Sequence, residues 1–281
     1  MKLNIVSIEG GLGNQMFQYA FYLGLKHTFF PNNYNEIFIA KYKQHNGYEL
    51  NRVFNIKKNS FKNYYLIGFL KKTLKRYMVK KIEKGELNYE QIFTTRNKLI
   101  IYYNGYWQSE NYFKNISPLI RETFKFNDDK ISEKNKNILE EIKKGNSISI
   151  HIRRGDYVNN INAMKILGDN CDLQYYQRAI EYICSVIPSP FFYVFSDEPE
   201  WAKNNFSFLK NSLIVDWNKG KDSWQDMMLM SRCNHNIIAN SSFSWWGAWL
   251  NDNNNKIVIA PKKWFNTFEA PNIVPNEWIR I

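Results

Sequence analysis

The sequence lacks the side-chain clusters that usually hold a metal ion or a disulfide framework. Cysteine occurs three times, at Cys171, Cys184 and Cys233, without C-x-x-C spacing, and the four histidines lie far apart. Neither D-x-D nor H-x-x-x-H occurs, and such spacings are what bring metal ligands together. We therefore expect no metal and no other resident cofactor, and we expect the cysteines to be reduced thiols.

Long apolar runs are also missing. No stretch approaches the roughly 18 apolar residues of a membrane span, and the apolar run near the N-terminus is too short for a signal peptide. The G-x-S-x-G element of serine hydrolases does not occur either. The expectation is a soluble, cytoplasmic protein.

The apolar content is nevertheless sufficient for two cores. The 281 residues exceed what one hydrophobic core usually supports. Hydrophobic residues make up 44% of the chain and aromatic residues 17%, which excludes a disordered protein. We expect two folded domains.

The net charge of +12 arises entirely in the first half of the chain. Up to Lys144 there are 25 Lys and Arg against 13 Asp and Glu, and after it the two kinds are equal in number. Residues 57–84 carry ten basic side chains and one acidic one among apolar residues, a pattern typical of a basic amphipathic helix or helix pair. Three interpretations stay open: a solvated face, a face on an anionic membrane surface or, least favoured because no recognition motif accompanies it, a nucleic-acid contact.

Strand and helix patterns alternate regularly in the second half. Strands are predicted at 147–152, 191–195, 213–215, 236–239 and 256–260, and helices at 173–186, 199–206, 223–233 and 243–250. This order predicts a mostly parallel sheet covered on both faces, a Rossmann-like domain without the glycine fingerprint.

The first half is less regular, and a domain boundary follows it. Strands are predicted at 3–8, 37–40 and 99–103, and helices at 16–27, 112–124 and 132–144. Because the last helix ends at Gly145 and a new strand series begins, we place the boundary there, between an N-terminal domain at 1–145 and a C-terminal domain at 146–281.

Residues 147–158, S-I-S-I-H-I-R-R-G-D-Y-V, mark the most informative strand end. The strand alternation stops at Ile152 and is followed by two arginines, a glycine and an aspartate. In open α/β sheets ligands bind at the carboxyl ends of strands, so Arg153 is a candidate for binding a phosphate group. The alternative is a surface ion-pair cluster of Arg153, Arg154 and Asp156.

Another predicted strand end runs into a helix through Asn240, Ser241 and Ser242. Hydroxyls and free backbone N–H groups at the positive end of a helix dipole suit a diphosphate, although a plain helix N-cap explains the same residues. Asp226 lies near the start of the preceding helix. It is either an ordinary helix-start acid or a carboxylate that accepts two hydrogen bonds from a guanine edge.

A strand, a glycine loop and a helix open the chain. Gly11 and Gly13 belong to the tight loop predicted at 10–15, which brings backbone N–H groups to a helix N-terminus and suits an anion or a closely packed sugar. The spacing is not that of a dinucleotide or P-loop site, so a purely structural turn is the alternative. Residues 104–110, N-G-Y-W-Q-S-E, place aromatic and amide side chains at a further strand end, as carbohydrate clefts do and as core edges do too.

Four of these stretches also carry a family likeness. They are G-G-L-G-N-Q-M-F-Q-Y-A at 10–20, H-I-R-R-G-D-Y-V at 151–158, F-S-D-E at 195–198 and N-S-S-F-S-W-W-G-A at 240–248. Together they closely resemble the bacterial-type α-1,2-fucosyltransferases of glycosyltransferase family 11. The likeness runs in the right order from the first strand nearly to Trp264 and leaves out only 57–84 and the C-terminal tail.

The resemblance implies a fold and a reaction. The fold is α/β and GT-B-like, with two Rossmann-like domains facing a cleft, the N-terminal one on the acceptor side and the C-terminal one binding GDP-fucose. The reaction is that of a galactoside α-1,2-fucosyltransferase: inverting, metal-independent transfer of L-fucose from GDP-fucose to the 2-hydroxyl of a terminal galactose. The implied partners are GDP-fucose and a galactose-terminated oligosaccharide or glycolipid, with no nucleic acid.

The resemblance also implies which residues bind the nucleotide. His151 and Arg153 contact it, with Arg153 at the β-phosphate. Asp226 binds the guanine, and Ser241 and Ser242 bind the diphosphate.

The implied reaction needs positive charge and, in some cases, a base. Displacement at the anomeric carbon builds negative charge on the departing GDP, and the planar fork of Arg153 suits its stabilisation. By the same resemblance Asn14 of the glycine loop faces the reaction centre. Asp156 is the candidate general base, but residues 158–161 lack the glutamate that some related fucosyltransferases place there. Either Asp156 serves or no strong base is needed.

Other functions remain open on the sequence alone. Within the enzyme class they are a fucosyltransferase of another linkage, such as α-1,6, or a transferase of another GDP-sugar. Outside it, a non-catalytic glycan-binding protein needs the sugar site without the nucleotide site, and a nucleic-acid-binding protein accounts for the charge. If residues 57–84 rest on lipid, the protein is peripheral at the inner face of the cell membrane.

Overall fold

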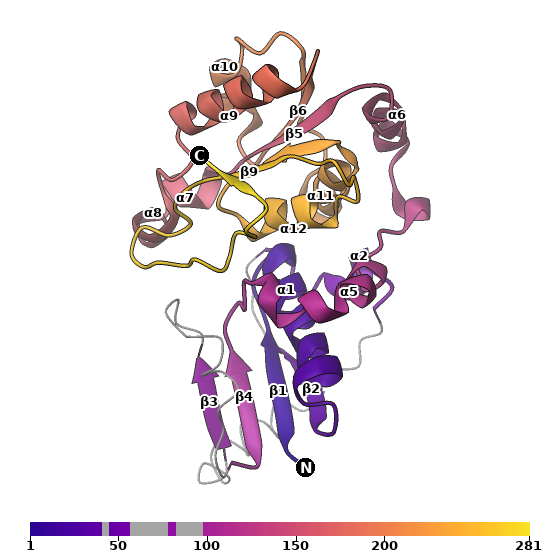
Figure 1. The fold of residues 1–281 in the computed structure, drawn as a ribbon, viewed down its shortest axis with the longest axis vertical. Helices are drawn as coiled ribbons and strands as arrows, with labels where there is room; N and C mark the ends of the chain where they lie inside the picture. Colours follow the sequence, from indigo (N-terminus) through magenta and orange to yellow (C-terminus); the bar gives the residue numbers. More distant parts are fainter. Residues whose placement is uncertain (41–44, 57–77, 83–97) are drawn as a thin grey trace. The chain divides into compact units, whose positions relative to one another are not determined.

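The protein forms two compact units, Met1–Phe126 and Asn127–Ile281. The computed structural model describes residues 1–40, 45–56, 78–82 and 98–281. Each unit is built on its own sheet, and all strand pairs in the described residues are parallel (Figure 1). Two α/β units with parallel sheets agree with the predicted fold class.

The first unit has a four-stranded sheet in the order β2-β1-β4-β3. Its strands are β1 (Leu3–Ile8), β2 (Tyr34–Ile39), β3 (Met78–Ile82) and β4 (Ile100–Asn104). Its α-helices are α1 (Leu12–Gly24), α2 (Leu50–Val53) and α5 (Ser117–Thr123). The strand predicted at 3–8 is confirmed, and those predicted at 37–40 and 99–103 are present with shifted ends.

Two predictions for the first unit are wrong in detail. The helix α1 begins at Leu12 and not at residue 16, because Gly11 already acts as its N-cap and Gly13 lies inside its first turn. The described part of the basic segment 57–84 is a strand and not a helix: Met78–Ile82 pairs in register with Ile100–Asn104 of β4. The rest of 57–84 lies outside the described residues.

An aromatic cluster forms the core where β4 ends. The rings of Phe21 and Trp107 stack at 4.3 Å, and Tyr103 and Tyr112 meet Phe21 edge-on at 5.2 and 5.1 Å. Trp107 is fully buried and has a positive φ of 54°, whereas Tyr106 is 46% exposed. The left-handed backbone therefore separates two neighbouring aromatic residues, one for the core and one for the surface.

The second unit has a six-stranded sheet in the order β10-β9-β8-β5-β6-β7. Its strands are β5 (Ser147–Ile152), β6 (Phe191–Ser196), β7 (Ser212–Val215), β8 (His235–Ile237), β9 (Val258–Ala260) and β10 (Ile279–Arg280). Its α-helices are α6 (Glu133–Ile142), α7 (Gly155–Asn159), α8 (Ile161–Leu167), α9 (Leu173–Val186), α10 (Pro199–Asn205), α11 (Trp224–Arg232) and α12 (Ser242–Leu250). The five strands and four helices predicted here are confirmed, with ends shifted by up to two residues.

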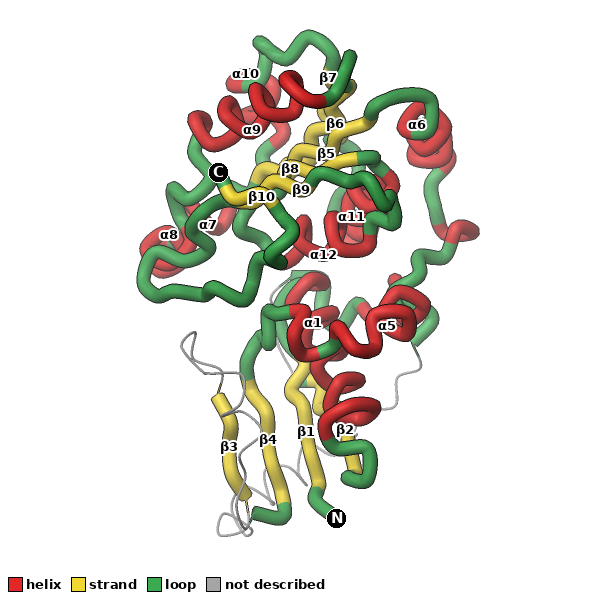
Figure 2. Tube along the Cα trace, in the orientation of Figure 1, coloured by secondary structure: helices red, strands yellow, loops and turns green. Residues whose placement is uncertain are grey.

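Helices cover both faces of this sheet. The helices α9 and α10 lie on one face and α11 and α12 on the other (Figure 2). The fully buried isoleucines Ile148 and Ile150 of β5 pack in one apolar core with Tyr176 and Ile183 of α9. On the other side α12 and α11 approach so closely that a Cβ on Gly247 would lie 2.9 Å from the Cβ of Met230.

The boundary between the units lies after Phe126, not at the predicted position 145. The reason is that α6 packs on the second unit through polar contacts. The buried Asn135 donates to the Oδ1 of Asn218 at 2.8 Å and to the Oε1 of Gln225 at 2.7 Å. These partners lie far along the chain, so the helix pattern alone assigned α6 to the wrong unit.

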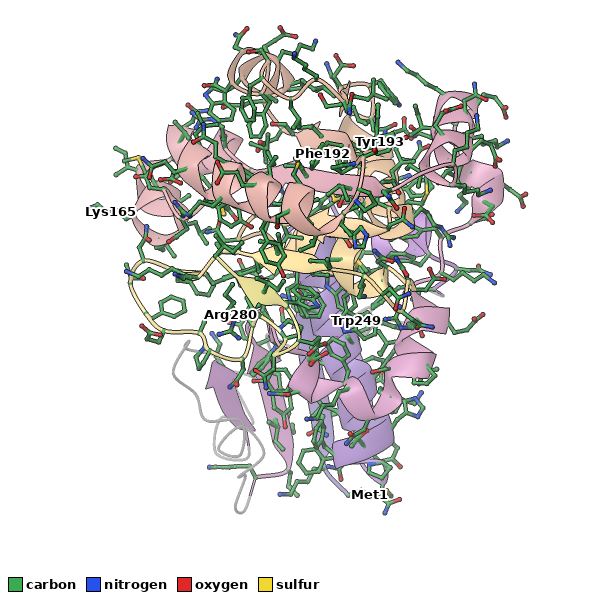
Figure 3. All side chains as sticks on the ribbon, turned by 45° about the horizontal axis from the view of Figure 1, so that its top comes forward. Met1, Lys165, Phe192, Tyr193, Trp249 and Arg280 are labelled. Carbon is green, nitrogen blue, oxygen red and sulfur yellow. The ribbon has the colours of Figure 1, made fainter. Side chains whose placement is uncertain are left out.

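Three elements of the second unit were not predicted. They are α7 and α8, which follow β5, and the short strand β10. No residue of α8 is buried, and Figure 3 shows Lys165 of that helix projecting away from the rest of the unit. The seven residues of α8 are too few for the window over which helical periodicity is assessed. No helix among the described residues is both long enough and apolar enough to span a membrane.

The end of α1 gives a test of the first unit's packing. A Cβ on Gly24 would lie 2.1 Å from the carbonyl oxygen of Tyr112, whereas a Cβ on Gly145 would meet nothing within 4 Å. We expect Gly24→Ala to lower the free energy of unfolding by roughly 1–3 kcal/mol or more, because backbone must move to make room. Urea denaturation measures this. Gly145→Ala is the matched control, and equal effects of the two changes would contradict the packing described.

Candidate active site

The strand order of the second unit creates one favoured place for a ligand. From β5 the chain runs through β6 to β7 on one side, and then returns to place β8 on the other side of β5. This is the 3-2-1-4-5-6 order of a doubly wound sheet, whose ligands bind where the order reverses, outside the carboxyl ends of the strands. That place lies between the carboxyl ends of β5 and β8. Arg153 comes directly after β5, and Ser241 lies in the loop after β8.

Both arginines after β5 form ion pairs with the residues that follow β6. Nη1 of Arg153 lies 3.0 Å from Oδ2 of Asp197, and Nε of Arg154 lies 3.2 Å from Oε2 of Glu198. The guanidinium of Arg154 also lies 4.0 Å from the centre of the Trp201 ring, a cation–π contact. The partners are thus the acids of the next strand end, and Arg154 is held in place by a carboxylate and an indole.

The glycine of this motif has a steric cause. A Cβ on Gly155 would lie 2.7 Å from Oδ2 of Asp197, and the other oxygen of Asp197 accepts from the backbone N–H of Arg154 at 3.0 Å. A side chain at 155 would therefore push away the carboxylate that contacts both arginines. Asp156, the candidate base, is the second residue of α7, and its side chain lies outside what the structure describes.

A tyrosine connects the two strand ends at the reversal point. The hydroxyl of Tyr157 donates to the backbone oxygen of Asn240 at 3.1 Å, and the Arg153 guanidinium lies 5.7 Å from the Tyr157 ring centre. The Asn240 side chain donates to the carbonyls of Leu167 and Trp264 at 2.9 and 3.0 Å. Asn240 therefore holds loops together, and the structure does bring the two predicted motifs side by side.

His151 is buried beneath this site. Its ring centre lies 5.7 Å from that of Phe243 in the first turn of α12. Burial, and secondarily the charge of Arg153, lowers the pKa of His151 to about 3, so the imidazole is neutral at physiological pH. Its Nδ1 has no hydrogen-bond partner among the described residues. A neutral ring with an unused nitrogen can accept or donate one hydrogen bond without adding charge.

The two serines after β8 differ in their surroundings. Ser241 is the N-cap of α12: it is 8% exposed, and its hydroxyl accepts from the backbone N–H of Phe243 at 3.3 Å. Ser242 is the first residue of the helix and is partly exposed. The N-cap alternative is thus what Ser241 does, while Ser242 and the backbone N–H groups of the first turn remain suited to an anion.

Asp226 lies in the first turn of α11, which packs against α12. It is partly exposed, yet loss of hydration raises its pKa to about 7, against the lowering effect of a hydrogen bond from Asn218. That bond, from Nδ2 of Asn218 to Oδ1 of Asp226, is 2.7 Å long. A carboxyl group whose pKa is raised this far, and which accepts a hydrogen bond from a fixed amide, differs from an ordinary solvated acid at the start of a helix.

Asn218 belongs to a buried polar network that the sequence did not indicate. Asn135 of α6 accepts from Nε1 of Trp217 at 2.8 Å and donates to Asn218 and Gln225. The network ties the end of β7 to α6 and α11. The strand-end rule could have flagged residues 217 and 218, but nothing local to the sequence indicates their partner in α6.

In the first unit, two buried glutamines explain the glycine-loop motif. Gln15 donates to the carbonyls of Gly10 and Gly47, both at 2.8 Å, and Gln18 accepts from the backbone N–H of Glu9 at 2.8 Å and donates to the carbonyl of Gly105 at 3.0 Å. These side chains fix the loop after β1 to its neighbours. Gly11 and Gly13 shape the start of α1, and no bound anion is needed to explain them.

Asn14 is held at the same strand ends. Its Oδ1 accepts from Nε2 of Gln108 at 2.8 Å, which orients the amide. In the described part of the chain, no group of three or more His, Cys, Asp or Glu has the arrangement to hold a metal ion.

Fold and site together define an α/β protein with a ligand site at the reversal of a doubly wound parallel sheet. The model of glycosyl transferase family 11 matches residues 1–281, and the chain belongs to this family. An alpha-1,2-colitosyltransferase of Escherichia coli is 35% identical over 295 residues, which cover 100% of this chain and 99% of that protein. The O-antigen biosynthesis glycosyltransferase WbnK of Escherichia coli is 33% identical, over 98% of this chain and 99% of its own length.

The solved structures support the fold. The crystal structure of the fucosyltransferase NodZ from Bradyrhizobium aligns with a TM-score of 0.51 and 13% identity, over 88% of this chain and 91% of that chain. The family resemblance seen in the sequence and the α/β, GT-B-like fold are therefore confirmed. The protein is a glycosyltransferase, whereas the roles of the individual site residues stay predictions.

The surroundings of Asp226 allow a test that needs no ligand. The Asn218 amide lowers the pKa of this carboxyl, while burial raises it to about 7. We expect Asn218→Ala to raise the pKa of Asp226 further, because the ionised form loses its hydrogen bond. Titration of the carboxyl carbon by NMR measures this. Exposed Asn162 of α8 supplies the control, as Asn162→Ala should leave the titration of Asp226 unchanged, and an unaltered pKa in Asn218→Ala would contradict the assignment.

Proposed function

We propose that the protein transfers L-fucose, or its 3-deoxy analogue colitose, from a GDP-sugar to the 2-hydroxyl of a terminal galactose, with inversion at the anomeric carbon and without a metal. The observation that carries the proposal is the meeting of the Arg153 and Ser242 strand ends at the reversal of the sheet, in a chain of glycosyl transferase family 11. An N-terminus of α12 and a guanidinium at one place suit a diphosphate.

The two donors differ at one hydroxyl, and each has its own support. GDP-fucose follows from the motifs shared with bacterial α-1,2-fucosyltransferases. The colitose donor follows from the full-length relative whose name is alpha-1,2-colitosyltransferase. That name also supports the α-1,2 linkage, whereas an α-1,6 linkage has only a likeness of fold behind it.

The chemistry requires charge stabilisation at the leaving group. As the bond from the anomeric carbon to the diphosphate oxygen breaks, negative charge grows on the β-phosphate. Arg153 donates hydrogen bonds to that phosphate, Ser242 and the α12 N–H groups bind the other oxygens, and the neutral His151 packs beneath. Asp226 accepts the N1–H and 2-amino hydrogens of guanine. The acceptor is a galactose-terminated oligosaccharide or glycolipid.

A direct assay tests the proposal. Purified protein is incubated with GDP-fucose or GDP-colitose and a panel of galactosides, and the product linkage is assigned by NMR. We expect an α-1,2 product from one of the two donors and saturable GDP binding by calorimetry. Glycan binding without GDP binding would instead indicate a lectin, and GDP binding with a product of another linkage would limit the proposal to the donor site.

Arg153 should be needed for the chemical step. We expect Arg153→Ala to reduce kcat by roughly two to three orders of magnitude, the scale of removing one preorganised donor at a developing charge. Arg178 on the exposed face of α9 provides the matched change, since Arg178→Ala removes the same charge away from the site. Steady-state kinetics separates the two variants, and a near-normal kcat in Arg153→Ala would refute the role.

Asp226 should make GDP binding depend on pH. Its pKa of about 7 means that the carboxyl is protonated below that pH, whereas guanine requires the carboxylate. GDP affinity should therefore fall as pH drops below about 7, by up to tenfold per pH unit. Calorimetry between pH 5.5 and 8.5 measures this, against ADP as the control nucleotide.

Asp226 should also determine which nucleobase the protein prefers. Asp226→Asn should lose the pH dependence and prefer XDP to GDP, because the asparagine amide donates to the 2-oxo group of xanthine. Retained GDP preference in this variant would show that guanine binds elsewhere.

A further inference from the structure

A second polar cluster lies at the carboxyl ends of β1 and β4, within the first unit, and the donor site proposed above does not use it. It comprises one carboxylate, three amides and one exposed aromatic ring: Glu9, Asn14, Asn104, Gln108 and Tyr106. The two strands are hydrogen-bonded neighbours in the sheet, so their ends present these side chains together. Of these residues, only Asn14 has been given a role so far.

Glu9 is held at its backbone, and its side chain has a weak partner. The backbone N–H of Glu9 donates to the buried Gln18 at 2.8 Å, which in turn donates to the carbonyl of Gly105 at 3.0 Å. The carboxylate accepts a single long hydrogen bond, 3.3 Å, from Nδ2 of Asn104. No lysine or arginine in the described part of the chain forms an ion pair with it. The backbone of Glu9 is thus held in place, and among the described residues its carboxylate has no cationic partner.

Gly10 keeps the space beside this carboxylate open. It has a positive φ of 84°, and a Cβ on it would lie 3.2 Å from Nδ2 of Asn14 and 3.5 Å from Cε1 of Tyr106. The Tyr106 ring is 46% exposed, and burial of part of the residue together with the charge of Glu9 raises the pKa of Tyr106. Asn14 and Tyr106 therefore lie beside the glycine that follows Glu9.

The backbone at this place is under strain. Trp107 adopts a positive φ of 54° while fully buried, a conformation that costs about 1–3 kcal/mol in general and that clusters at functional sites. Its effect here is to leave Tyr106 on the surface and to direct Gln108 to Asn14. The strain thus assembles the cluster.

The chemistry of the cluster is that of a sugar site with a base. Aromatic faces stack on the apolar face of a sugar, and amides hydrogen-bond its hydroxyls. A carboxylate accepts a hydroxyl hydrogen and, if that oxygen is reacting, takes its proton. We propose that Glu9 binds the attacking hydroxyl of the acceptor sugar and is its general base. This proposal rests on the function proposed above.

In the proposed transfer step one bond forms, one bond breaks and one proton moves. The hydroxyl oxygen of the acceptor bonds to the anomeric carbon of the donor sugar, and its proton moves to the Glu9 carboxylate. The bond from that carbon to the diphosphate oxygen breaks, and its electron pair leaves with GDP. Glu9 then loses the proton to water. Asp156, the base suggested by the sequence, is the rival for this role, and a plain solvated acid at position 9 is the other alternative.

The test is Glu9→Gln, which keeps the shape of the side chain and removes its basicity. We expect kcat for transfer to fall by two to four orders of magnitude, the usual contribution of a general base, while the Kd for GDP and the Tm stay as in the wild type. At saturating donor, where the titration of Asp226 has little effect, the fall in kcat/KM for the acceptor toward low pH should be absent from the variant. Among the described residues, Tyr102 and Tyr106 interact electrostatically with Glu9, and their raised pKa values keep them from titrating in the acid range. His45, whose Nδ1 lies 3.7 Å from the position of a Cβ on Gly11, is the nearby imidazole, so the acid limb should persist in His45→Asn.

Two controls keep the result specific. Glu36→Gln makes the same change in the middle of β2 and should not alter kcat. Glu9→Ala should regain activity when formate is added, because formate replaces the missing base; it would not restore a merely structural role. This rescue also tests the proposal if Glu9→Gln folds poorly. A kcat of Glu9→Gln within about threefold of the wild type, or an acid limb that disappears in Asp156→Asn and persists in Glu9→Gln, would overturn the assignment.

Failure of the proposed function gives a different result. In that case the wild type neither binds GDP nor forms an α-1,2 product, and the assignment of Glu9 falls with it. If the wild type does both and Glu9→Gln is unimpaired, the function stands and only the role of Glu9 is wrong.

Discussion

The parallel order of strands in the second unit is the constraint on which its site depends. Because β5 is the first strand of the series and β8 the fourth, the chain leaves their carboxyl ends in opposite directions, toward α9 on one face and α12 on the other. No crossover helix covers the gap between two such ends, so polar loops converge there. The isoleucines at alternate positions of β5 lie on one face of the sheet and pack against α9, which holds this strand in the core. The position of Arg153 is therefore a consequence of packing far from any ligand.

Buried amides hold the loops that the strands bring together. Gln18 joins the ends of β1 and β4, Asn240 joins the end of β8 to two further loops, and Asn135 joins α6 to the end of β7. An amide offers both donors and an acceptor, so one side chain satisfies backbone groups of two segments. Burying such an amide costs free energy unless all of its hydrogen bonds are made. The loops must therefore adopt the geometry in which these hydrogen bonds form. Gln18 and Asn240, which belong to the family motifs, thus act on loop structure.

Sequence patterns predicted what depends on local burial and missed what depends on distant partners. Apolar runs bounded by turn-forming residues predicted strands at 147–152 and 191–195, and the structure has strands there. The helix α8 has only seven residues, and β3 has five with two adjacent lysines, so neither was predicted from its sequence. In the site, the strand-end rule located Arg153 and Ser242, whereas Asn218 was missed because its partner Asn135 lies 83 residues away.

The charge balance at the reversal point limits how the proposed diphosphate would be recognised there. The guanidinium groups of Arg153 and Arg154 each lie against a carboxylate, Asp197 and Glu198. Two positive and two negative charges leave little net electrostatic potential at this place. His151 adds no charge, because burial lowers its pKa. The attraction for an anion must then come from the direction of hydrogen bonds, namely the Arg153 fork and the first N–H groups of α12. Directional donors fixed by packing stabilise a charge at one position only, and a transferase needs this selectivity because the charge on its leaving group appears in the transition state.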